Sequence, residues 1–165
     1  MGGHSRVLVL VHVVWSTLNR QPVLAVSADR WLARLLSAKA AEVDCGVVAA
    51  GNASDHVHVV LALGARACLA DVARRLKGAS SHAWNQRHAV HLSWQKGYWA
   101  ESVSARDLDG LQRYVVDQRR HHANNAVWEP WPDDVPQGSS SHHDSPPKAG
   151  LPADGRRGEE PASPR

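Results

Sequence analysis

Cysteine is scarce in this chain of 165 residues. Its two cysteines, Cys45 and Cys68, form no Cys-x-x-Cys pair. Two separated thiols cannot build a disulfide framework, and they do not favour a structural zinc site built on thiolates. The cysteine usage is typical of a reducing, intracellular setting, so we expect a cytoplasmic protein.

Long apolar segments are also missing. The longest apolar run, Val7 to Trp15, is interrupted by His12. It falls far short of the roughly 20 residues that a membrane-spanning helix requires. No small-residue cleavage site follows it, so we expect neither a signal peptide nor a membrane partner.

Apolar periodicity is absent from the last part of the sequence. Residues 133–165 consist largely of Ser, Pro, Gly and charged side chains, and they contain six acidic and four basic residues. Such a segment cannot bury enough apolar surface to offset the entropy of ordering, so we predict a disordered tail. Residues 1–132 then form one domain.

The predicted domain is more basic than the whole chain. The full sequence has 19 basic and 16 acidic residues, which leaves 15 and 10, or a net charge of +5, in residues 1–132. A basic domain favours a polyanionic partner such as a nucleic acid.

Strand-like and helix-like apolar patterns alternate along the domain, and the two middle strands form a hairpin. This order predicts an α+β fold, with an antiparallel sheet covered by helices. We expect strands at 7–15, 47–50, 55–63 and about 98–103, and helices from Ser27 to the Gly46 region, from Leu69 toward Trp84, and from Ser104 to about His122.

Three local signals refine these boundaries. Ser27 is a suitable N-cap, and Gly46 stands where a left-handed residue would end the first helix. Gly51-Asn52 is typical of a turn between the two hairpin strands. In the last helix, Leu108, Leu111 and Val115 are spaced to face the core.

His56-Val57-His58 is the first candidate for a chemical site. Side chains alternate along a strand, so the two histidines share one face while Val57 points to the other. The apolar face would anchor the strand and leave the histidine face free to share one divalent cation. Each imidazole would then need an acceptor for its second ring nitrogen. Asp55 points to the opposite face and is a doubtful ligand.

The last helix carries the second candidate. Tyr114, Gln118 and His121 follow i, i+4, i+7 spacing and form one stripe. A tyrosine at the border of a helix's apolar face most often packs its ring against the core and exposes its hydroxyl to water. A His-x-His pair alone is likewise a weak motif in a chain with 11 histidines.

The joint pattern resembles a known family. Residues 6–122 contain Asp55-His56-Val57-His58, Leu76-Lys77-Gly78 with Ser80-Ser81, Trp94-Gln95-Lys96-Gly97-Tyr98 and the tyrosine helix. Together these motifs resemble the single-tyrosine HUH transposases of small bacterial insertion sequences, the IS200-like group, which also includes the REP-associated tyrosine transposases. Two features depart from the family: the loop Leu18 to Gln21 is less basic than usual, and the helical continuation expected after His122 is missing.

The resemblance implies a site, a fold and a reaction. Tyr114 would be the nucleophile, and His56, His58 and Gln118 would hold a divalent metal. Mixed nitrogen and oxygen ligands with open positions suit Mg²⁺ or Mn²⁺, although two histidines also accept zinc or nickel. The fold would be a ferredoxin-like sheet. The reaction would be nicking and rejoining of single-stranded DNA hairpins through a 5′-phosphotyrosine, in a homodimer whose subunits can exchange the tyrosine helix.

Several side chains are candidates for holding the DNA by phosphate contacts and stacking. Each could equally be a solvated charge or a core tryptophan. They are Lys77, Arg87, Lys96, Arg119 and Arg120, with Trp84, Trp94 or Trp99. Two other functions also stay open: a module that binds single strands without cutting, and a nuclease in which the histidines activate water.

Overall fold

The computed structural model describes residues 7–123, with side chains described for residues 7–120. The predicted tail, residues 133–165, lies outside the described residues. No helix within the described range is long and apolar enough to cross a membrane.

Four strands form one antiparallel sheet in the order β2-β3-β1-β4. Helices α1 and α2 connect the strands in the βαββαβ sequence of a ferredoxin-like fold, and α3 and α4 follow. The predicted α+β, ferredoxin-like architecture is confirmed. The elements are β1 Val9–Ser16, α1 Asp29–Ala41, β2 Gly46–Asn52, β3 His56–Leu63, α2 Leu69–Asn85, β4 Trp99–Ser102, α3 Leu108–Val116 and α4 Gln118–Ala123.

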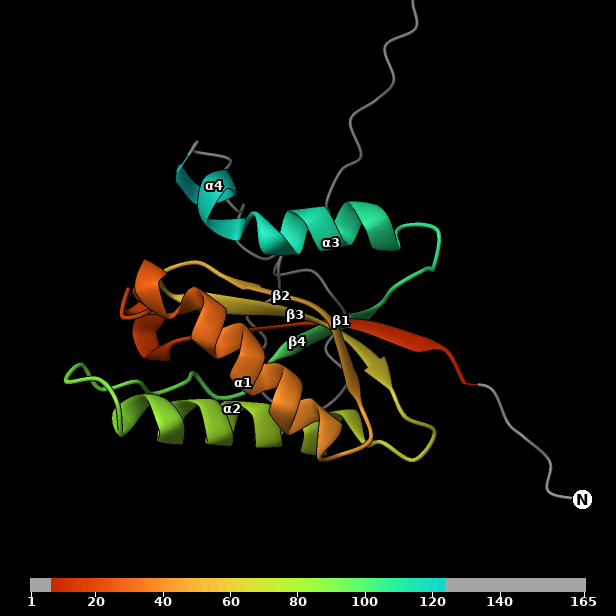
Figure 1. Ribbon diagram of the computed structural model, residues 1–165, viewed down its shortest axis with the longest axis horizontal. Helices are drawn as coiled ribbons and strands as arrows, with labels where there is room; N and C mark the ends of the chain where they lie inside the picture. Colours follow the sequence, from red (N-terminus) through yellow and green to blue (C-terminus); the bar gives the residue numbers. More distant parts are fainter. Residues whose placement is uncertain (1–6, 124–165) are drawn as a thin grey trace, which may run out of the picture.

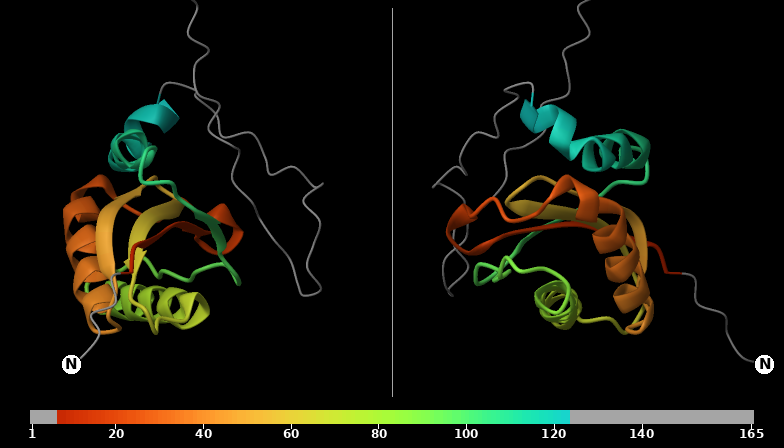
Figure 2. Two further views of the ribbon diagram at one scale, coloured as in Figure 1. Left: turned by 90° about the vertical axis from the view of Figure 1, so that its right-hand side faces the viewer. Right: turned by 60° about the vertical axis from the view of Figure 1, so that its left-hand side comes forward.

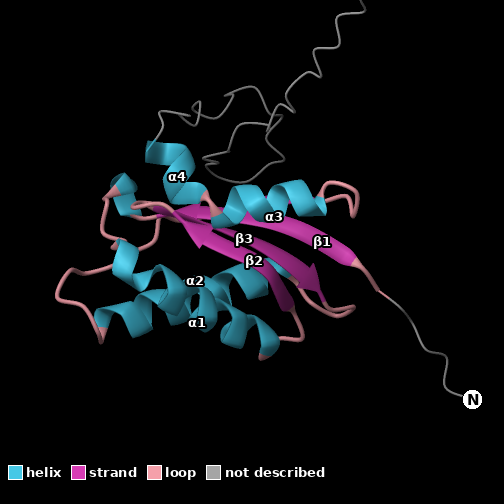
Figure 3. Cartoon of the chain, turned by 45° about the horizontal axis from the view of Figure 1, so that its top comes forward, coloured by secondary structure: helices cyan, strands magenta, loops and turns pink. Residues whose placement is uncertain are grey.

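Helices cover both faces of this sheet. Helices α1 and α2 pack on one face, while α3 and α4 lie over the other (Figures 1 and 3). The turned views in Figure 2 show the same three layers. The tyrosine helix therefore has a face of the sheet to itself, separate from the face that holds the main core.

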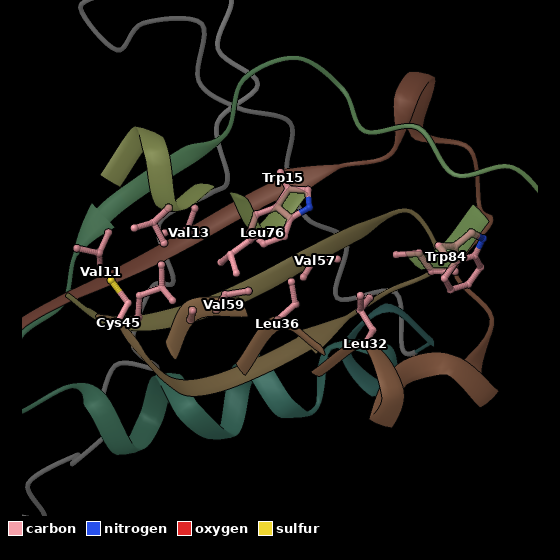
Figure 4. Close-up of a cluster of buried hydrophobic side chains, with 14 of the residues drawn as sticks. Val11, Val13, Trp15, Leu32, Leu36, Cys45, Val57, Val59, Leu76 and Trp84 are labelled. Atoms are coloured by element: carbon pink, nitrogen blue, oxygen red, sulfur yellow. The ribbon is translucent and has the colours of Figure 1, made fainter. Parts of the chain in front are cut away.

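The main core lies between the sheet and helices α1 and α2 (Figure 4). Alternate residues of β1 and β3 point into it, among them Val13 and Val59, both fully buried. Leu32, Leu36 and Leu76 meet them from the helices. A smaller cluster under α3 contains the buried residues Ala49, Val60 and Val115, with Leu108, Leu111 and Tyr114 packed against them.

Two predicted features of the first helix are wrong. Ser27 is not the N-cap, because Val26–Ala28 form a 3-10 turn and α1 begins at Asp29 after Ala28. The acidic Asp29 in the first turn interacts favourably with the helix dipole instead. Asp44, not Gly46, adopts the left-handed conformation, with φ of 57°. A short polar side chain tolerates that region, so the turn closes before Gly46, which begins β2.

The prediction of a Gly51-Asn52 turn is also wrong, because both residues belong to β2. A Cβ atom on Gly51 would lie only 1.7 Å from the carbonyl oxygen of Val115 in α3. The glycine is needed because the backbone of the tyrosine helix approaches the strand at this point. A close approach and a turn can both call for glycine, and the sequence alone did not separate them.

The last helix was predicted as one segment but consists of two. The backbone leaves helical geometry at Asp117, with φ of −92° and ψ of 17°, between α3 and α4. Arg119, in the first turn of α4, donates from Nε and Nη2 to the carboxylate of Asp29 at 2.5 and 2.6 Å, and from Nη2 to the Leu24 carbonyl at 2.8 Å. These bonds tie α4 to the start of α1, a long-range contact that helical periodicity cannot reveal.

We predict that Gly51→Ala lowers the free energy of unfolding by about 1 to 3 kcal/mol, the usual cost of forcing extra volume into a packed contact. Gly110→Ala is the matched control, since Gly110 lies inside α3 and a Cβ atom added there would have nothing within 4 Å. It should stabilise the protein by about 0.5 to 1 kcal/mol through helix propensity. Urea unfolding followed by circular dichroism measures both. A Gly51→Ala protein as stable as the wild type would contradict the close approach.

Candidate functional site

His56 and His58 lie on the face of β3 that α3 covers. Val57 and Val59 point into the main core on the other face, as the strand alternation predicts. The sequence suggested that the histidine face is free, and this prediction is wrong. His56 is 1% exposed and His58 is fully buried. The third helix turns this polar stripe of the sheet into an interior site.

Asp55 holds the first histidine. Its Oδ1 lies 2.6 Å from Nδ1 of His56, and its Oδ2 lies 3.5 Å from Nη1 of Arg20. An ionised carboxylate only accepts, so His56 donates from Nδ1 and could present Nε2 to a cation. Asp55 thus stands behind its neighbouring histidine and supplies the acceptor that a metal-binding imidazole requires.

The partner of the second histidine is His12, a residue that the sequence analysis did not assign to the site. His12 Nε2 lies 2.9 Å from His58 Nδ1, and the two rings stack with centroids 5.1 Å apart. His12 lies in β1, between the core-facing Val11 and Val13, so it points to the same face as His58. The signal in the sequence that could have identified His12 is that it is the single polar residue in the apolar run Val7 to Trp15.

Tyr114 contacts the second histidine, and Gln118 is buried four residues after the tyrosine. The ring of Tyr114 meets that of His58 edge-to-face, with centroids 5.8 Å apart. Gln118 is 1% exposed and donates from Nε2 to the Tyr114 carbonyl at 3.0 Å. Its Oε1 is buried with no hydrogen-bond partner among the described residues. The structure therefore brings Tyr114 into contact with His58 and buries the Gln118 side chain, whereas the side chain of His121 lies outside the described residues.

These donors fit a divalent cation. Within the part of the chain that the structure describes, no three His, Cys, Asp or Glu side chains are arranged to hold a metal ion. A third donor beside His56 and His58 would have to be of another type, and the buried amide oxygen of Gln118 is a candidate of the right chemistry. Two imidazoles whose Nδ1 atoms are engaged elsewhere, with one amide oxygen, would suit a divalent cation that also binds substrate oxygens.

Burial governs the ionisation of the tyrosine. Burial raises the pKa of the Tyr114 phenol above its usual value, and a hydrogen bond from Gln118 lowers it in part. The raised pKa makes the phenolate of Tyr114 rarer at neutral pH than that of an ordinary tyrosine. A positive charge placed beside the phenol would favour the phenolate and so offset the effect of burial.

The candidate DNA-binding cations are scattered. Lys77 donates to the carbonyls of Gln95, at 2.7 Å, and Gly97, on the α2 side of the sheet. Arg87 lies over the ring of Trp31 at 5.4 Å, and Arg119 is engaged with Asp29. Lys96 and Arg120 are exposed. The structure does not gather the five into one surface.

The candidate stacking tryptophans are also divided among different roles. Trp84 is buried in the main core and donates to the Val90 carbonyl at 2.9 Å. Trp94 is partly buried and donates to Ser80 Oγ at 3.0 Å. Trp99 packs edge-to-face on His12, with centroids 5.5 Å apart. Of the three, Trp99 is the one next to the histidine site.

Comparison with known proteins places the chain among transposases. A family model described as "Transposase IS200 like" matches residues 5–118. Two solved structures share the fold. One, assigned to a transposase of Deinococcus radiodurans R1, has 24% identity, a TM-score of 0.55 and coverage of 72% of this chain and 98% of that one. The other, a REP-associated tyrosine transposase bound to a REP hairpin, has 15% identity, a TM-score of 0.54 and coverage of 77% and 76%. The search of curated proteins found no match.

We predict that phenolate formation by Tyr114 in the folded, metal-free protein has its midpoint above pH 10. Tyr98→Phe leaves Tyr114 as the sole tyrosine, so its ultraviolet absorbance titration reports one group. The same protein in urea should titrate near the ordinary value of about 10. Because the folded pKa is raised, the associated stability is present below pH 10 and is lost as the pH rises further. A folded midpoint at or below 10 would contradict the burial of the phenol.

Proposed function

Because this chain belongs to the IS200-like transposase family, we propose that it cleaves and rejoins single-stranded DNA at hairpin ends of a mobile element, with Tyr114 as its nucleophile. Family membership makes it an enzyme of DNA cleavage and strand transfer. The observation that carries the finer proposal is the edge-to-face contact of Tyr114 with the buried His58. The buried amide oxygen of Gln118, four residues after Tyr114, supports it. A similarly folded transposase is bound to a REP hairpin, which supports a hairpin substrate here.

The proposed reaction is an in-line displacement at phosphorus. The Tyr114 oxygen bonds to the phosphorus of the scissile phosphodiester, and the bond from phosphorus to the 3′-oxygen breaks. The phenol loses its proton to solvent, and the departing oxygen takes one up to become a free 3′-hydroxyl. The 5′-phosphotyrosine retains the bond energy, so a later 3′-hydroxyl can rejoin the strand without ATP.

The chain's residues prepare this attack. Tyr114 starts as a neutral phenol, and at a pKa near 10 only about one molecule in a thousand is ionised at pH 7, a deficit of about 4 kcal/mol. Burial adds to the deficit. We propose that His56, His58 and Gln118 hold Mg²⁺ or Mn²⁺, which when bound supplies Lewis acidity toward the phosphate oxygens. The packed rings of His58 and Tyr114 hold the phenol beside that position.

The proposed site is closed in the state described. His58 is fully buried and Gln118 is 1% exposed, so a phosphate can reach them only after the segments that cover them move. The ion pair between Arg119 and Asp29 is the contact that would have to open with α4. In the described chain Tyr114 meets its own His58. The homodimer, and exchange of the tyrosine helix between subunits, stay predictions.

Replacement of Tyr114 by Phe tests the nucleophile. Tyr114→Phe removes one oxygen atom and should abolish both cleavage and the covalent adduct while leaving metal and hairpin affinity nearly unchanged. Labelled hairpin DNA incubated with the protein and Mn²⁺ is analysed on a denaturing gel. Tyr98→Phe is the matched control and should keep full adduct formation.

The same gel separates the alternative functions. Cleavage that persists in Tyr114→Phe, with free product and no adduct, would indicate a nuclease that uses water. A wild-type protein that binds the hairpin but gives neither product nor adduct would indicate a binding module. Either result would overturn the proposed nucleophile.

Replacement of neighbouring residues of β3 tests the metal site. His58→Ala should weaken Mn²⁺ binding and cleavage together, with His58→Gln as a second variant of closer size. Val57→Ala should leave Mn²⁺ affinity unchanged and lower the free energy of unfolding by about 1 to 3 kcal/mol, since it deletes buried methyl groups in the main core. Titration calorimetry and urea unfolding measure the two quantities. Equal loss of metal affinity in both proteins would contradict the separation of the two faces.

A further inference from the structure

Two polar side chains, the buried His12 and the half-exposed Glu101, line up across the sheet behind the proposed metal ligand His58. Glu101 lies directly opposite His12 in the pairing of β4 with β1. Its Oε1 lies 3.6 Å from His12 Nδ1, and His12 Nε2 lies 2.9 Å from His58 Nδ1. The three residues come from three different strands, and no strand pattern by itself brings them together.

The position of His12 is costly unless it serves its neighbours. Its side chain is 4% exposed on the central strand β1, although an imidazole buried without hydrogen bonds is destabilising. The ring of His12 contacts those of Trp99 and His58, with centroids 5.5 and 5.1 Å away. Of its two nitrogens, Nε2 faces His58.

The carboxylate of Glu101 lies within ion-pair range of His12 Nδ1, although beyond hydrogen-bond distance, and its negative charge favours a hydrogen on that atom. An ionised carboxylate can only accept, so it favours the His12 tautomer that carries hydrogen on Nδ1. His12 Nε2 then offers a lone pair, and the hydrogen bond to His58 can form only if His58 donates from Nδ1. His58 in that tautomer has its lone pair on Nε2, the atom that a metal ligand must present.

We propose that Glu101 and His12 are positioning residues that fix the tautomer and orientation of His58 so that its Nε2 faces the metal. This inference rests on the proposed function and deepens it. Asp55 plays the corresponding part for His56, at 2.6 Å from its Nδ1. The two ligands thus differ in their support: one is backed by a carboxylate directly, the other by a carboxylate acting through a second imidazole.

The first test uses the metal-free protein, so that it does not depend on the proposed function. Long-range nitrogen–proton correlation spectra of ¹⁵N-labelled protein distinguish the imidazole tautomers, and His58→Gln identifies the His58 signals. The wild-type protein should show His58 protonated on Nδ1. His12→Phe keeps a ring in the same place but removes the acceptor, so His58 should move to a mixture or to the Nε2-protonated form. An unchanged Nδ1 tautomer in His12→Phe would overturn the proposal.

The second test measures Mn²⁺ affinity by titration calorimetry. His12→Phe should bind Mn²⁺ about 10 to 100 times more weakly, the range usual for loss of a group that orients a metal ligand. His12→Gln restores an acceptor near the same position and should recover most of the affinity. Glu101→Gln, at a half-exposed side chain, should cause a smaller loss.

Val14→Ala is the control for a merely structural effect. Val14 is buried in the same strand and pairs directly with His58, but it has no polar side-chain atom. It should lower thermal stability without changing Mn²⁺ affinity or the His58 tautomer. If Val14→Ala weakened Mn²⁺ binding as much as His12→Phe did, His12 would be a packing residue and the proposal would fail. If His58→Gln bound Mn²⁺ as tightly as the wild-type protein, the proposed metal site would be refuted. The tautomer experiment would still decide the role of His12.

Discussion

The structure depends on the burial of two imidazoles between a sheet and the helix that carries Tyr114. His56 and His58 lose nearly all contact with water under α3, so their ring nitrogens must find partners inside the protein. Asp55 and His12 supply partners on the Nδ1 side. Each ring therefore has its Nδ1 engaged, and Nε2 is the nitrogen that it can present to another group.

A second constraint keeps the helix close enough for that arrangement. Gly51 lets the backbone of α3 approach β2 to a distance that a methyl group would prevent. Beyond the break at Asp117, Arg119 binds Asp29 and so fastens α4 to the start of α1. Asn52 donates to the same Asp29 carboxylate at 2.9 Å. The close contact and the ion pair flank Gln118, whose side chain is buried.

The sequence predicted the architecture well because periodicity reports directly on burial. The four strands and the first two helices lie close to their predicted positions, and the faces of β3 are as expected. The errors concern residues whose role is set by a distant partner. Gly51 was interpreted as a turn residue because its close approach to Val115 involves a residue far away in the chain. The last two helices were predicted as one because the bond of Arg119 to Asp29 is also long-range.

The sequence by itself determined the family, the α+β fold and the candidates His56, His58, Tyr114 and Gln118, since these follow from spacing along single elements and from a joint motif. Only the tertiary structure decided that the histidine face is an interior surface and that His12 and Glu101 stand behind His58. It also decided that Arg119 is engaged with Asp29. The physical reason is that hydrogen bonds and ion pairs between different strands and helices depend on how the elements pack, which one-dimensional periodicity does not encode.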